Sequence, residues 1–168
     1  CVAIAVFVMA SLAHAAEAKW PTGSASDFAI LVTMQRFRIY ADHCSDKVPS
    51  LKPRFEILME SLSRRIQGVS QSLLSSDEFR GMKKKPVPTA ISFAFEDSLE
   101  DARRNFERQD ADSICPKKLQ TLGEMGLASL GHDLTQTFMA VQGMIQNLEK
   151  EGAGDASRGS REQRRGSP

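Results

Sequence analysis

Apolar side chains recur along the chain at intervals of three and four residues, the spacing that places them on one face of an α-helix. Two of these stripes are long and regular. They are Phe55, Leu58, Leu62, Ile66, Val69 and Leu73, and then Leu127, Leu130, Leu134, Phe138, Val141, Ile145 and Leu148. No segment of useful length alternates between apolar and polar residues as a half-buried strand does. The pattern predicts an all-α protein.

The first predicted helix, residues 28–44, is apolar on two sides. Met34 and Phe37 belong to one stripe, and Leu31 and Ile39 lie on nearly the opposite side. A helix that is apolar on two sides is usually packed between neighbours, so we expect this one to be central. Ser26 or Asp27 precedes it and can accept a hydrogen bond from a free backbone N–H as a cap.

Three further segments complete the helical pattern. A second helix is expected from 51 to 74 or 79, with Pro53 in its first turn, where a missing N–H costs little. A third helix is expected to begin at Thr89, which can act as its cap. Phe93 points away from the apolar stripe of this helix. A fourth runs to about residue 150, and Gly131 lies where it can break into a fifth helix.

The start of the fourth segment resembles the other helix starts. Asp112 or Ser113 can cap it, and Pro116 is tolerated if it falls in the first turn. Because the connections between segments are short, neighbouring helices should run antiparallel. The fold expected for residues 27–150 is an antiparallel bundle of four helices, or five if the last one breaks.

Both ends of the chain lie outside this bundle. Residues 2–13 form an uncharged apolar run that is too short to span a bilayer, and small residues follow it, as in a secretory signal peptide. We expect residues 1–15 to be a signal peptide whose basic n-region is missing, with cleavage before Ala16 or Lys19. Residues 16–26 then form an irregular lead-in. Residues 151–168 have no apolar side chain larger than Ala and should form a disordered tail.

Removal of the signal peptide leaves two cysteines, Cys44 and Cys115. Disulfides persist in the oxidising compartments that exported proteins reach, and the two cysteines lack the spacing of a redox or zinc motif. They lie at the end of the first predicted helix and the start of the fourth, which alternating helix directions bring to the same end of the bundle. We therefore predict a Cys44–Cys115 bond, which would close a loop of about 70 residues.

Charge and composition exclude some classes of partner. Lys and Arg total 22 and Asp and Glu total 21, so the formal net charge is +1 and gives no reason to expect a nucleic-acid partner. The densest basic patch is the loop that contains Arg80, Lys83, Lys84 and Lys85, which offers contacts to an acidic partner or an anionic surface. After signal cleavage no transmembrane span is expected.

Chemistry-bearing residues do not converge on a known motif. His43 with Asp42 or Asp46 provides too few ligands for a metal site, and His132 faces away from its apolar stripe. Motifs for phosphate, dinucleotide or nucleophilic chemistry are missing, so we assign no catalytic residue, metal or cofactor.

The resulting expectation is a periplasmic or secreted protein that acts by binding. One reading is a protein-interaction module, such as an envelope adaptor, inhibitor or secreted partner, and it requires an exposed docking surface. The other is a carrier of a small apolar ligand in a pocket between helices, which requires a hollow of a few hundred Å³ with convergent polar groups.

Overall fold

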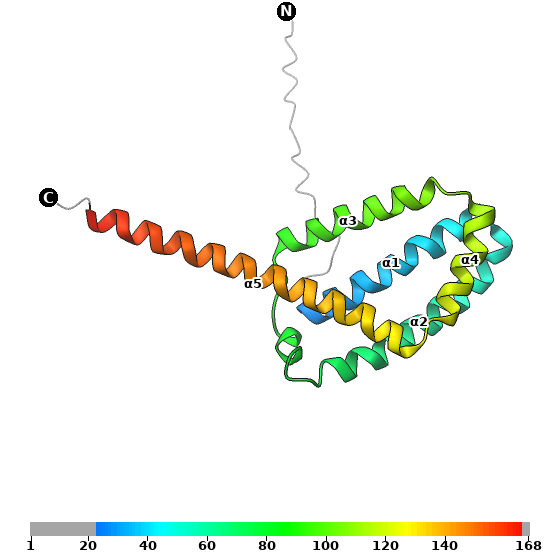
Figure 1. Ribbon diagram of the computed structural model, residues 1–168, viewed down its shortest axis with the longest axis horizontal. Helices are drawn as coiled ribbons and strands as arrows, with labels where there is room; N and C mark the ends of the chain where they lie inside the picture. The colour runs from blue at the N-terminus through cyan, green and yellow to red at the C-terminus, as the bar shows by residue number, and fades with distance from the viewer. Residues whose placement is uncertain (1–22, 166–168) are drawn as a thin grey trace, which may run out of the picture.

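The computed structural model describes the backbone of residues 23–165 and the side chains of residues 23–151 (Figure 1). The expected signal peptide, residues 1–15, lies outside the described residues, as does most of the lead-in. Within the described part, five α-helices and two short 3₁₀ segments form an all-α bundle, as the apolar pattern predicts. They are α1 (Ala25–Lys47), η1 (Pro49–Leu51), α2 (Lys52–Leu73), η2 (Arg80–Lys83), α3 (Thr89–Glu107), α4 (Ala111–Glu124) and α5 (Leu127–Arg165).

Helix α1 is the centre of the bundle and contacts each of the other four α-helices. Its N-terminal half buries Phe28, Val32 and Met34, and its C-terminal half buries Phe37 and Cys44. This confirms the expectation drawn from its two apolar sides. The apolar stripes of α2 and α5 complete the core with fully buried side chains. They include Phe55, Leu62, Ile66, Leu130, Leu134 and Phe138.

The path of the helices decides which of them become neighbours. Helix α2 returns beside α1, and the long connection through η2 brings the start of α3 back to the start of α1 (Figure 1). Helix α3 therefore packs on α1 in the same direction, while α5 runs back in the opposite direction. Ring contacts fix this register, with Phe28 against Phe95 near one end and Tyr40 against Phe106 near the other.

Several helix boundaries differ from the sequence expectation. Helix α1 begins at Ala25 rather than 28, because Ser24 is the cap and its Oγ accepts the N–H of Asp27 at 3.2 Å. The Ala25 N–H also donates to the Lys85 carbonyl at 2.7 Å, a contact between distant segments that local sequence cannot show. Helix α2 ends at Leu73, and α3 begins at Thr89 with Pro88 in the cap position.

The start and the end of α4 also differ from the sequence expectation. Asp110 rather than Asp112 or Ser113 caps α4, and its carboxylate accepts the Ser113 N–H at 3.1 Å. Pro116 consequently lies in the second turn, where its ring removes one helical N–H donor. The fifth helix exists, but the break falls at Met125 and Gly126, whereas Gly131 lies inside α5.

The carbonyl of Met125 explains how this break is stabilised. It accepts a hydrogen bond from the guanidinium of Arg65 on α2, so a side chain of another helix holds the corner between α4 and α5. At its other end, α5 continues to Arg165, into the segment 151–168 for which we predicted a disordered tail. The C-terminal part of α5 extends away from the other helices of the bundle (Figure 1).

Candidate interaction surfaces

A groove runs along the outside of the bundle between α1 and α3. Two hollows of about 330 and 630 Å³ share Gln35, Ile39 and Arg103 as lining residues, and together they form what we call the α1–α3 groove. The floor of the smaller hollow is apolar, because Leu31 and Ile39 of α1 and Leu99 of α3 lie there, each partly buried. Among the described residues that line the larger hollow, Ile39 is the one apolar side chain. The groove therefore has an apolar base in its smaller hollow and a mainly polar lining in its larger one.

The groove exists because the two helices are held together near their ends. Phe28 and Phe95 meet edge-on with ring centroids 5.5 Å apart, and Tyr40 and Phe106 do so at 4.7 Å. The outer sides of α1 and α3 between these contacts are not covered by another described helix, since α2 and α5 pack on the other sides of α1. The second apolar side of α1 thus lies partly at the surface, where Ile39 lines the groove.

The rims of the groove carry an excess of negative charge. The charged lining residues are Asp42, Asp46, Glu96, Asp97, Glu100 and Glu107 on the acidic side, and Lys47 and Arg103 on the basic side. Glu100 is ion-paired with Arg103 at 3.6 Å and with Arg104 at 3.4 Å. The other five carboxylates form no ion pair within the described part of the chain.

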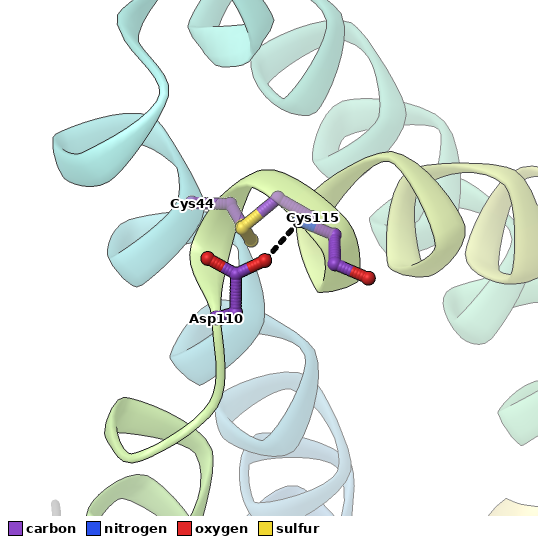
Figure 2. The surroundings of a disulfide bond; sticks show 4 residues. Cys44, Asp110 and Cys115 are labelled. Carbon is purple, nitrogen blue, oxygen red and sulfur yellow. Dashed lines mark hydrogen bonds between the residues drawn. A yellow bond between two sulfur atoms is a disulfide. The ribbon is translucent and has the colours of Figure 1, made fainter.

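The disulfide closes the bundle near one end of this groove. Cys44 at the last turns of α1 and Cys115 in α4 are bonded, with their Cα atoms 5.5 Å apart and both residues fully buried (Figure 2). Asp110 lies beside them and caps α4, as the dashed line in Figure 2 shows. The predicted pairing is confirmed, and it ties the end of the central helix to the crossing helix.

His43, next to the disulfide, is not the solvated side chain that its polar neighbours suggest. Its ring meets Phe106 edge-on at 5.0 Å, and its Nε2 atom is shielded from solvent without a hydrogen-bond partner among the described residues. Asp42 and Asp46 line the same hollow, yet residues 23–151 hold no group of three or more His, Cys, Asp or Glu side chains that could bind a metal ion. His132 is exposed on α5.

The basic loop is partly tied to the bundle. Arg80 pairs with Asp77 at 3.0 Å, and Lys85 pairs with Glu149 of α5 at 3.1 Å. Lys83 and Lys84 are exposed and form no ion pair with described residues. The loop remains a candidate contact surface through these two lysines, and its acidic or anionic partner stays a prediction.

Another hollow, of about 500 Å³, lies between α2 and α5 and is mainly apolar. Leu127, at the first turn of α5, is 60% exposed there beside Val69 and Leu73. No carboxylate lines it, and Arg65 is its one charged lining residue. It differs from the α1–α3 groove in that it offers no arrangement of charge to select a partner.

Sequence reasoning missed the α1–α3 groove, although its parts were visible. Leu31 and Ile39 form the second apolar side of the first predicted helix, and the outer face of residues 89–107 carries acidic side chains interleaved with Arg103 and Arg104. What sequence could not supply was the same-direction pairing of α1 with α3, which brings the apolar strip and the acidic face together.

Fold and surfaces define the class of this protein as a disulfide-linked, all-α bundle with an open acidic groove. Comparison with models of known protein families, with curated proteins and with solved structures finds no match to the chain. None of the described helices is long and apolar enough to cross a membrane.

Proposed function

We propose that this protein is an exported helical bundle that binds a protein partner through the α1–α3 groove and does not act as a catalyst. It would serve as an envelope adaptor, inhibitor or secreted partner. The observation that carries this proposal is the groove itself. Leu31, Ile39 and Leu99, each partly buried, lie between charged side chains of α1 and α3, and an apolar strip bordered by polar residues is typical of a protein-binding site.

Two features support export. The apolar run of residues 2–13, followed by small residues, is typical of a secretory signal peptide. The fully buried Cys44–Cys115 bond is a structural disulfide, and such bonds persist in the periplasm and outside the cell. A periplasmic or secreted location accounts for both features.

A carrier of a small apolar ligand is the alternative function. The 330 Å³ hollow is within the size range of small-molecule sites, which favours this alternative. Such sites, however, usually bury roughly 70–90% of the ligand surface. The α1–α3 groove is bounded by exposed Asp97 and Arg103, so a small apolar molecule there would keep much of its surface in water. A protein partner covers the whole length of the groove and suits it better.

The test is recovery of bound molecules from cells that produce the protein. Gln35 lines both hollows of the groove, and Gln35→Trp would fill it with a large side chain. Gln71→Trp, at an exposed position of α2, is the matched control. Mass spectrometry of the purified, tagged protein should find one protein at near-equal amounts with the wild type and with Gln71→Trp, and little with Gln35→Trp.

Two results would contradict the proposal. If Gln35→Trp retains the same protein partner as the wild type, the groove is not its binding site. If the wild type carries a small apolar molecule at near-equal amounts and no protein, and Gln35→Trp loses that molecule, the carrier alternative is correct. Circular dichroism of both variants must match the wild type before either comparison is made.

A further inference from the structure

We propose that the partner segment bound by the α1–α3 groove is a cationic amphipathic helix. This inference rests on the proposed function and specifies the chemistry of the partner. Three properties of the groove carry it: the charge of its rims, the spacing of its apolar floor and the number of its carboxylates that lack an ion-pair partner.

The charge is local and does not reflect the whole chain. The protein has a formal net charge of +1, whereas six acidic and two basic side chains line the groove. Charges further apart than a Debye length of about 8 Å are largely screened at physiological salt. The groove therefore favours a partner whose positive charges are spread along it, next to the individual carboxylates. An acidic segment would meet repulsion along both rims.

The spacing of the floor suits a helix. Leu31 and Ile39 are eight residues apart on α1, a distance of about 12 Å along the helix axis. Apolar residues one to two turns apart on a docked helix lie about 5 to 11 Å apart, so two or three of them fit over this strip. Leu99 of α3 supplies the other side of the floor. The occupant thus needs an apolar face of about two turns, with basic residues on each side of it.

The carboxylates on the rims are available for pairing. Glu100 already shares Arg103 and Arg104, but Glu96 and Asp97 beside it on α3 have no ion pair among the described residues. Asp42 and Asp46 on the α1 rim are exposed and also lack one. The repulsion between neighbouring carboxylates falls when cations bind beside them. A lysine-rich or arginine-rich helix would therefore be attracted to both rims of the groove.

The arginines near the C-terminus of a second copy fit less well. Four arginines follow residue 151, but no apolar side chain larger than Ala accompanies them. Such a segment could pair with the rims and would leave the floor of Leu31, Ile39 and Leu99 uncovered. The groove therefore selects a segment that is both basic and apolar, which points to a different protein.

The experiment uses a synthetic peptide as the probe. A helical peptide of about 18 residues, built from Leu and Lys with the leucines on one face, is titrated into the ¹⁵N-labelled protein. A Leu/Glu peptide with the same pattern and a Leu/Lys peptide of scrambled order are the matched controls. We expect binding in the micromolar range by the amphipathic Leu/Lys peptide, amide shifts confined to α1 and α3, and at least about tenfold weaker binding by both controls.

Charge-neutralising variants then separate specific from general attraction. The triple variant Glu96→Gln, Asp97→Asn and Glu107→Gln removes three rim charges and should weaken binding about tenfold or more. The control triple variant Glu78→Gln, Glu124→Gln and Glu151→Gln changes net charge equally at exposed positions outside the groove. It should change the affinity less than about twofold.

Three outcomes would overturn the inference. These are equal weakening by the two triple variants, shifts centred on elements other than α1 and α3, or equal binding of the Leu/Glu peptide. A dimer in sedimentation that disappears on truncation after Glu151 would instead assign the groove to a second copy. If Gln35→Trp removes a co-purified partner but the Leu/Lys peptide does not bind, the proposed function stands and the cationic class of partner is wrong.

Discussion

Tyr40 of α1 and Phe106 of α3 meet edge-on, with ring centroids 4.7 Å apart and planes inclined by 71°. The ammonium group of Lys118 on α4 lies 4.4 Å from the centroid of the same tyrosine ring. This contact links three helices at the disulfide end of the bundle and sets how α3 lies on α1. The α1–α3 groove depends on it, since a different register would move the acidic rim away from the apolar floor.

Replacement of Phe106 by Ala should therefore destabilise the bundle. Phe106 is buried and contacts both Tyr40 and His43, so the change should cost about 3 to 5 kcal/mol in the free energy of unfolding. Phe93, on the same helix, is 43% exposed and provides the control, with an expected cost below about 1 kcal/mol for Phe93→Ala. Urea unfolding followed by circular dichroism measures both values, and equal costs would refute the packing described for α3.

Loss of the disulfide should lower stability without removing the helices. The bond joins residues separated by 71 positions, and its removal from a small domain typically costs about 2 to 5 kcal/mol. We expect Cys44→Ala with Cys115→Ala to shift the urea midpoint downward while most helical signal at zero urea is retained. Thiol titration of unfolded, unreduced protein that begins at Ala16 should find no free cysteine. One or more free thiols per chain would contradict the bond.

The hydroxyls of Thr33 and Thr137 form a polar contact inside the core. Their oxygens lie 3.2 Å apart between α1 and α5, and both residues are almost completely buried. Each hydroxyl also bonds a backbone carbonyl of its own helix, Thr33 that of Ala29 at 2.9 Å and Thr137 that of Asp133 at 3.0 Å, so Thr33→Val does not leave Thr137 unsatisfied. Replacement of either threonine by Val should therefore cost about 1 kcal/mol. The double variant should cost less than the sum of the two, with a coupling of about 0.5 kcal/mol or more in a double-mutant cycle. Strict additivity would show that the hydroxyls do not interact.

The end of α5 should be dispensable for stability. From residue 152 onward the chain has no apolar side chain larger than Ala, and the helix projects away from the bundle (Figure 1). Truncation after Glu151 should leave the Tm within about a degree or two. A fall of about ten degrees in differential scanning calorimetry would show that this segment packs against the bundle in solution.

Export predicts the N-terminus of the mature protein. Small residues precede Ala16 and Lys19 at the distance expected for signal cleavage. N-terminal sequencing of protein recovered from the periplasm or the medium should begin at one of these two residues. Recovery of exported protein that still contains Val2 would refute the signal-peptide interpretation.

The sequence by itself determined the helical segments, the central place of α1 and the pairing of Cys44 with Cys115. Each of these follows from local properties. Apolar residues repeat with the period of a helix, one segment is apolar on two sides, and two cysteines lie at helix ends that alternating directions bring together. Even the exposed position of Phe93 could be read from its place outside the apolar stripe.

Tertiary structure decided the helix boundaries and the groove. Ser24 caps α1, where a backbone bond from Ala25 reaches Lys85, and Arg65 of α2 holds the corner at Met125. The Ala25–Lys85 and Arg65–Met125 contacts join residues that are far apart in the chain, so no local pattern contains them. The groove has the same origin. Ile39 and Glu100 line the same hollow because α3 returns beside α1. The position of α3 depends on contacts throughout the core and not on any one segment of the sequence.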